Sequence, residues 1–163
     1  MRAYGKTKDK DLGKKRIEKE IAKMKKSFVT VGVHDDKEYK GGTSVALVAA
    51  VNEFGTTRAG KDHNIVIPER SFLRSTFDEK INLMKSKISS LALAIIQGKT
   101  TTQTALRQVG ADFRDMIRGK IETGDFEKNE EKYLKRKLKS GAGKPLIHTR
   151  KLLRSIDYEV KVK

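Results

Sequence analysis

The chain contains no cysteine and no tryptophan among its 163 residues, and it has only two prolines. The absence of cysteine excludes a disulfide framework, a cysteine nucleophile and thiolate metal ligands. No apolar run approaches the roughly 18 residues that a membrane-spanning helix needs, and no apolar segment follows the first charged residues. We therefore expect no membrane partner and no secretory signal peptide.

Positive charge is abundant but unevenly distributed along the chain. The formal net charge is +16, yet residues 27–127 carry 14 lysines and arginines against 13 acidic residues. Residues 1–26 carry 11 against 4, and residues 128–163 carry 12 against 4. A nearly neutral body with basic ends differs from a domain built around one basic recognition face. Charge alone therefore leaves the class of partner open.

Two helices are predicted in the first third of the chain. Apolar residues at helical spacing, separated by lysines and glutamates, predict an amphipathic helix over residues 11–26. A short alanine-rich helix begins at Val45, with Thr43 or Ser44 as its cap, and ends at Gly55.

Three strands are predicted from alternation and from β-branched residues. Valines alternate with Thr and Gly over residues 28–34, and apolar residues alternate with charged ones over residues 156–162. The run Ile-Val-Ile at residues 65–67 predicts a third strand. Residues 56–64 show no apolar period, so we expect an exposed loop there.

A long helical hairpin is predicted between the second and third strands. Pro68 is expected to start its first helix, which ends at Gly98, and one of three threonines caps the second helix. Apolar residues form a seam of nearly constant 3.5-residue period: Leu73, Phe77, Ile81, Met84, Ile88, Leu91 and Ile95. Because the second helix carries a matching stripe, a core role for the seam is favoured over an oligomer interface.

The order of these elements fits a single α+β domain spanning residues 1–163. We expect a small, mainly antiparallel sheet packed against the long helical hairpin and the N-terminal helix. Residues 123–144 contain three glycines and a basic run, which predicts a mobile basic arm. A short helix at residues 151–154 then leads into the last strand.

Candidate catalytic groups are weak, so we expect neither an enzyme nor a cofactor. His34, Asp35, Asp36 and Glu38 offer nitrogen and oxygen ligands, but further convergent ligands are lacking, and a polar turn is the simpler interpretation. Gly141, Ala142, Gly143 and Lys144 lack the spacing of a phosphate loop, and Pro145 stands where such a loop has Ser or Thr.

Nucleic-acid binding is the better-supported alternative. Five cations of the arm are candidate contacts for a protein partner or nucleic acid: Lys132, Lys135, Arg136, Lys137 and Lys139. Against it, the arm contains only Tyr133 as an aromatic residue, whereas single-strand binders usually stack bases on several aromatic rings.

Three short motifs follow one another along the chain. The first is Asn52, Glu53, Phe54, Gly55 and Thr56. The second is Ile67, Pro68, Glu69, Arg70, Ser71, Phe72, Leu73 and Arg74. The third is Lys144, Pro145, Leu146, Ile147, His148 and Thr149, continued by Leu152, Ser155 and Ile156. Each has a local physical reason, since glycine suits a left-handed helix end and proline suits a helix start.

In order and spacing, these motifs resemble those of the neck and tail-completion proteins of tailed bacteriophages, also described as head–tail joining, virion-morphogenesis or tail-component proteins. The resemblance implies that the protein is a non-catalytic structural component of a phage or prophage virion and that its copies form a ring. It further implies phage connector or tail-tube proteins as partners, and a location in the virion after assembly in the host bacterial cytoplasm. Any contact with nucleic acid would be non-specific.

The third motif departs from the family pattern at one position. Arg150 stands where the family has a glycine after threonine, so the helix is expected to start at Thr149 without a tight turn. We also expect Glu53 and Arg70 to hold the junction between the short helix, the second strand and the long helix, because both lie at helix ends where charge meets free backbone groups.

Overall fold

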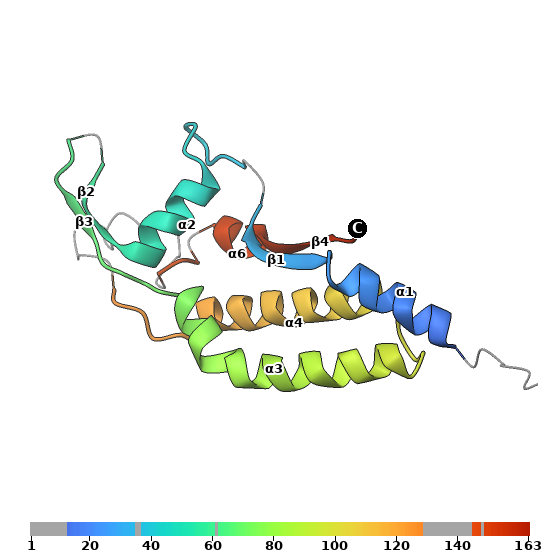
Figure 1. The fold of residues 1–163 in the computed structure, drawn as a ribbon. Helices are drawn as coiled ribbons and strands as arrows, with labels where there is room; N and C mark the ends of the chain where they lie inside the picture. Colours follow the sequence, from blue (N-terminus) through green and yellow to red (C-terminus); the bar gives the residue numbers. More distant parts are fainter. Residues whose placement is uncertain (1–12, 35–36, 61, 129–144, 148) are drawn as a thin grey trace, which may run out of the picture.

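The computed structural model describes residues 13–34, 37–60, 62–128, 145–147 and 149–163. The helices and strands form an α+β fold, as the sequence predicts (Figure 1). The elements are α1 (Lys14–Met24), β1 (Phe28–Val33), α2 (Val45–Phe54), β2 (Thr56–Ala59), β3 (Ile65–Ile67), α3 (Arg74–Ile96), α4 (Thr102–Thr123), α6 (Lys151–Ser155) and β4 (Ile156–Lys161).

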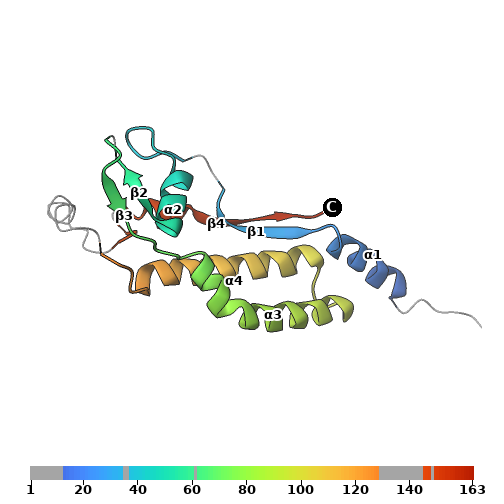
Figure 2. The ribbon, with the colours of Figure 1, turned by 60° about the vertical axis from the view of Figure 1, so that its left-hand side comes forward.

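The molecule is elongated and built on the α3–α4 hairpin. Figure 1 shows the β1–β4 sheet lying over α4, with α1 extending at one end and α2 and the β2–β3 hairpin at the other. Figure 2 shows the same order along the molecule from a second direction. The two ends are therefore built from different elements, and α1 is far from β2 and β3.

The strands form two separate antiparallel pairs. Strand β1 pairs with β4 so that Phe28 lies opposite Lys161 and Val33 opposite Ile156. Strand β2 pairs with β3, with Thr56 opposite Ile67. The expected loop at residues 56–64 is therefore wrong for its first part. A two-stranded hairpin that projects from the body has no buried face, so its sequence shows no apolar alternation. Within the described residues, β1 and β4 pair only with each other.

The first helix of the hairpin begins later than Pro68. Helix α3 starts at Arg74, and residues 68–73 form a non-helical link. The Arg70 amide donates to the Asn52 carbonyl (2.6 Å), and the Phe72 amide donates to the Arg70 carbonyl (2.8 Å). These hydrogen bonds hold the link against the end of α2 in a non-helical conformation.

The turn between α3 and α4 follows the predicted signals. Gly98 takes a left-handed conformation with φ 77°, just after the end of α3. Of the three threonines, Thr101 is the cap, and its hydroxyl accepts from the amide of Thr104 (3.3 Å). Ser44 likewise caps α2 by accepting from the amides of Ala46 and Leu47.

The hydrophobic core lies where α2, α4 and α6 meet. Its buried members are Val45, Ala49, Phe72, Ile117, Ile121, Leu152, Leu153 and Ile156. Further along α4, Gly110 brings the helix close to the sheet: a Cβ there would lie 2.6 Å from the Tyr158 ring and 2.8 Å from a Val29 methyl. Any larger residue at position 110 would push α4 away from β1 and β4.

The apolar seam of α3 is only partly core. Met84 and Ile95 are buried, but Phe77 and Ile88 are 51% and 49% exposed. The expectation of a core seam is therefore wrong for these two residues. Helix α3 lies at the edge of the molecule and packs against α4 along one side. Phe77 meets the Phe113 ring edge-on at 6.1 Å and Ile88 lines an apolar cavity, so both side chains are covered on one side only.

Candidate functional site

The three sequence motifs meet at the end of the molecule that carries α2. The first motif forms the end of α2, the second forms the link into α3, and the third leads into α6. We call the region formed by residues 52–56, 67–74, 145–147 and 149–152 the motif junction. It is the candidate functional site because it brings together residues that are about 100 positions apart.

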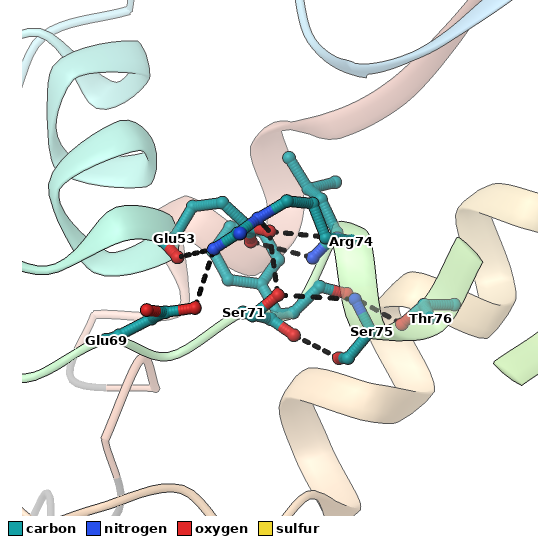
Figure 3. A network of polar contacts seen from close by, with 8 residues as sticks. Glu53, Glu69, Ser71, Arg74, Ser75 and Thr76 are labelled. Atoms are coloured by element: carbon teal, nitrogen blue, oxygen red, sulfur yellow. Dashed lines mark hydrogen bonds and ion pairs between the residues drawn. The ribbon is translucent and has the colours of Figure 1, made fainter. Parts of the chain in front are cut away.

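Glu53 lies at the centre of the motif junction and is only 2% exposed. One carboxylate oxygen accepts from the Leu73 amide (2.8 Å), and the other accepts from the Arg74 amide (2.9 Å) and the Ser71 hydroxyl (3.1 Å). The residue before α3 is Leu73, whose side chain cannot cap a helix. Glu53 therefore supplies from α2 the anionic cap that α3 lacks (Figure 3).

Arg74 returns the contact from α3 to α2. Its guanidinium donates to the Glu53 carboxylate (3.2 Å) and to the Glu53 main-chain carbonyl (2.9 Å), and it also donates to Glu69 (2.7 Å). Figure 3 shows Arg74 between the two glutamates. The guanidinium carbon lies 4.7 Å from the ring centroid of Phe54, within the range of a cation–π contact. Each helix thus contributes the cap of the other.

Arg70 is the second buried charge of the motif junction, with 2% exposure. Its guanidinium donates to the Asn52 side-chain oxygen (2.9 Å) and to the Glu127 carbonyl (2.8 Å). Burial lowers the pKa of Arg70, while the charge of Glu127 acts in the opposite direction. Arg70 therefore connects the end of α2 with the segment that follows α4.

Gly55 and Phe72 complete the packing of the first two motifs. Gly55 has φ 69°, and a Cβ at this position would lie 2.9 Å from the Glu69 nitrogen and 3.1 Å from the Ile67 carbonyl oxygen. Only glycine allows the two chain segments to approach so closely. Phe72 is completely buried in the core, whereas Phe54 is 64% exposed and points away from it.

The third motif contributes apolar contacts to the motif junction. Leu152 is buried, and Leu146 and Ile147 pack against the core beside it, directly after Pro145. The Thr149 hydroxyl accepts from the amide of Lys151.

Arg150 stands where the motif that the third segment resembles has a glycine, and its backbone adopts a conformation that is typical of glycine. Arg150 has φ 53°, in the left-handed region, and α6 begins one residue later at Lys151. The expected start at Thr149 without a tight turn is therefore wrong. The arginine takes a strained conformation instead, which costs roughly 1–2 kcal/mol relative to glycine.

The prediction of a mobile arm is wrong for its first residues, 123–128, which the structure describes as part of the folded body. Thr123 belongs to α4, Phe126 packs against the core, and the Glu127 carbonyl accepts from Arg70. The five candidate contact residues of the arm lie outside the described residues: Lys132, Lys135, Arg136, Lys137 and Lys139.

A cavity of about 680 Å³ lies beside the third motif and is lined by Lys37, Tyr39, Lys40, Thr149, Lys151 and Arg154, together with Ser155. Its polar groups serve the fold. Lys151 donates to the Glu38 carbonyl and lies over the Tyr39 ring, and the Ser155 hydroxyl donates to the Lys151 carbonyl (2.9 Å). Burial raises the pKa of Tyr39. The described residues that line the cavity are therefore mainly cationic.

The residues that we weighed as metal ligands and interpreted as a polar turn are partly described by the structure. His34 shares a hydrogen bond with the Thr30 hydroxyl (2.8 Å), and the Glu38 backbone pairs with Ser44. Asp35 and Asp36 lie outside the described residues. In the part of the chain that the structure describes, no three His, Cys, Asp or Glu side chains are grouped as metal ligands.

Membrane insertion has no candidate helix among the described residues, since none combines the length and apolar character needed to cross a bilayer.

The sequence did not predict two contacts that α1 makes with the ends of α3 and α4. The Arg16 guanidinium donates to the carbonyls of Ile95 (3.1 Å) and Ile96 (2.9 Å) at the end of α3. The Glu20 carboxylate accepts from the amide (2.9 Å) and hydroxyl (2.8 Å) of Thr102 at the start of α4. An arginine and a glutamate four residues apart are common on exposed helices, so the sequence carries no signal for these distant partners.

The chain has no match among models of known protein families, curated proteins or solved structures. The functional argument therefore rests on the motifs and on the geometry of the described residues.

Proposed function

We propose that the protein is a non-catalytic structural subunit of a tailed phage or prophage virion that acts in head–tail joining or tail completion and forms a ring during assembly. The observation that carries the proposal is the motif junction. Three motifs that resemble those of such proteins contact one another, and their charged residues bind helix ends and backbone groups.

A structural role fits the chemistry of the motif junction better than catalysis does. Glu53 accepts hydrogen bonds from two amides and a hydroxyl, and Arg74 donates to a carbonyl and two carboxylates. A general base or a substrate-binding cation needs hydrogen-bonding capacity that is left for the substrate. The buried charged side chains of the motif junction instead form hydrogen bonds with other groups of the protein.

The surface around the motif junction suits contacts between subunits. Three large apolar side chains are at least half exposed on α2 and β3: Leu47, Phe54 and Val66. Exposed apolar groups close to a rigid framework are typical of protein–protein contact regions. A ring requires a head-to-tail contact, in which this end binds a different surface of the next copy and the rotation between copies closes.

The proposed partners are connector or tail-tube proteins of the same particle. A protein that supplies a symmetric template would offset the loss of translational freedom when copies assemble. The site of action is then the virion, reached from the cytoplasm of the host bacterium.

Deletion of the gene from its phage or prophage tests this function. We expect electron micrographs of induced lysates to show heads and tails that fail to join, or incomplete tails, and we expect a plasmid copy of the gene to restore infectious particles. A deletion that leaves particle structure and titre unchanged would overturn the proposal.

A basic nucleic-acid-binding protein is the competing function. Its predicted contact residues in the arm lie outside the described residues. Normal particles in the deletion experiment, together with nanomolar sequence-selective DNA binding, would favour it over the structural role.

A further inference from the structure

Positive charge gathers at the end of the molecule formed by α1. The C-terminal end of β4 lies beside the start of β1, with the Lys161 ammonium 6.0 Å from the Phe28 ring centroid, and the α3–α4 turn lies beside Arg16. We call this surface the basic pole. Its exposed cations are Lys14, Lys15, Lys19, Lys25, Lys26, Lys99, Lys161 and Lys163.

The basic pole is a fixed surface because α1 is held by two of its own side chains. Arg16 binds the carbonyls at the end of α3, and Glu20 binds the first amide of α4. Ile17 is half-buried, and Met24 lines an apolar cavity of about 180 Å³ together with residues of α3 and α4. The lysines on the other side therefore project from an anchored helix.

The lysines form a stripe along α1. At 100° per residue, Lys15 and Lys19 lie on the side opposite Ile17 and Met24, and Lys26 continues this side just after the helix. From Lys15 to Lys26 the stripe is about 16 Å long at 1.5 Å per residue. Duplex DNA presents one phosphate charge per about 1.7 Å of its axis with both strands counted, so a length of duplex equal to the stripe carries about ten phosphates, of which the stripe faces those on one side.

Few carboxylates offset this charge. Glu18 lies 3.9 Å from Lys14 in an exposed pair. Glu20 is already bound by Lys23 (2.8 Å) and Thr102. The stripe formed by Lys15, Lys19 and Lys26 therefore keeps its positive potential.

We propose that the basic pole binds the phosphate backbone of duplex DNA without sequence preference. Single-strand recognition would require several stacking aromatic rings, and the described part of the basic pole has only Phe28. Membrane binding would require a broad apolar face, whereas Ile21 and Met24 of α1 are only 39% and 36% exposed and Met24 lines the cavity beside α3 and α4. This contact goes beyond the proposed structural role and does not depend on it.

The test uses the full-length protein in three variants that each remove four positive charges. The pole variant carries K15Q, K19Q, K25Q and K26Q. The control variant changes exposed lysines elsewhere: K40Q, K80Q, K85Q and K128Q. The arm variant carries K135Q, R136Q, K137Q and K139Q. Fluorescence anisotropy measures binding to a labelled random-sequence duplex, its single strand and phosphatidylglycerol vesicles, at salt concentrations between about 50 and 200 mM.

We expect the pole variant to lose at least about tenfold in duplex affinity and to lower the slope of log K against log salt by roughly 3 to 4, since each phosphate contact contributes about 0.9. The control variant should bind as the wild type does, and circular dichroism should show that both are folded. Wild-type affinity in the pole variant would overturn the proposal, as would loss of binding in the arm variant alone. Preference for single strands or vesicles over the duplex would also overturn it. Particle assembly is not measured here, so failure leaves the structural role intact.

Discussion

Arg16 and Glu20 lie one helical turn apart on α1 and bind opposite kinds of helix end. Arg16, a cation, donates to two carbonyls at the C-terminus of α3, and Glu20, an anion, accepts from the first amide of α4. Each charge matches the partial charge of the helix end that it binds. The two contacts hold the α3–α4 turn against α1, whose own packing surface is small.

Removal of the Glu20 carboxylate should destabilise the protein. In Glu20→Ala, the Thr102 amide and hydroxyl lose a buried charged acceptor, and we expect the free energy of unfolding to fall by about 1–3 kcal/mol. Urea unfolding followed by circular dichroism measures the change. Glu18→Ala is the matched control, because Glu18 is exposed and paired only with Lys14 at 3.9 Å. Equal stability of the two variants would contradict the capping role.

The same carboxylate should make stability depend on pH. Hydrogen bonds from Lys23 and from the Thr102 backbone and hydroxyl lower the pKa of Glu20 to about 2, whereas an unfolded glutamate has a pKa of about 4.3. The stabilisation is therefore complete above pH about 4.3 and is lost as the pH falls toward 2. We expect the difference in stability between wild type and Glu20→Gln to be largest near pH 6 and to shrink between pH about 4 and 2. A difference that stays constant across this range would exclude the linkage.

Glu53 should be more important for stability than its neighbour Glu69. Glu53→Ala removes the acceptor of two amides at the start of α3, and we expect a loss of about 2–3 kcal/mol. Glu69→Ala removes an exposed contact with Arg74, and we expect a loss below about 1 kcal/mol. Thermal unfolding of both variants gives the comparison, and unchanged melting of Glu53→Ala would remove Glu53 from the framework of the motif junction.

A methyl group at position 55 should be poorly tolerated. Gly55→Ala places a Cβ 2.9 Å from a backbone nitrogen, in addition to the strain of a positive φ. Gly42 has a similar φ of 80° and open space around it, so Gly42→Ala carries the strain alone, roughly 1–2 kcal/mol. We expect Gly55→Ala to be clearly the less stable of the two in urea unfolding. Equal losses would mean that the segments at Gly55 can separate at no cost.

Ring formation is expected to depend on the exposed apolar side chains near the motif junction. We expect the isolated protein to be monomeric or weakly associated and to form a ring only with a connector or tail-tube protein, the proposed partner. Leu47→Ser should leave the melting temperature unchanged and reduce ring formation, as measured by mass photometry of the mixture. Leu93→Ser, at a similarly exposed position on α3, is the control. A partner that binds one copy without ring formation would contradict the model.

Local sequence patterns correctly predicted the elements that are determined by residues close together in the sequence. The alternating valines gave β1, and the threonine and glycine signals gave the α3–α4 turn at Thr101 and Gly98. The start of α3 was misplaced because it depends on Glu53 and Asn52, which bind the link from another helix. No local pattern can show that Pro68 precedes a link rather than a first helical turn.

Some residues of the candidate site could likewise be predicted from the sequence, and others could not. The motifs identified Glu53 and Arg70, but nothing in the sequence indicated Arg74 as the residue that binds the end of α2. Phe77 and Ile88 belong to a regular seam, yet periodicity does not show whether a neighbour exists to cover a residue. Whether a seam residue is buried depends on how many helices surround α3, which is determined by the whole fold.

The two-stranded β1–β4 sheet has a consequence for the subunit before assembly. Each strand pairs with the other within the described residues, so the sheet has two open edges that could template pairing with further chains. Strand β4 exposes a charged side chain at every second position, at Asp157, Glu159 and Lys161. Charged edge strands resist the stacking of identical chains, because like charges would come together at each added layer. If the proposed function holds and the subunit is made in many copies, its own edge charges thereby protect it against amyloid-like aggregation.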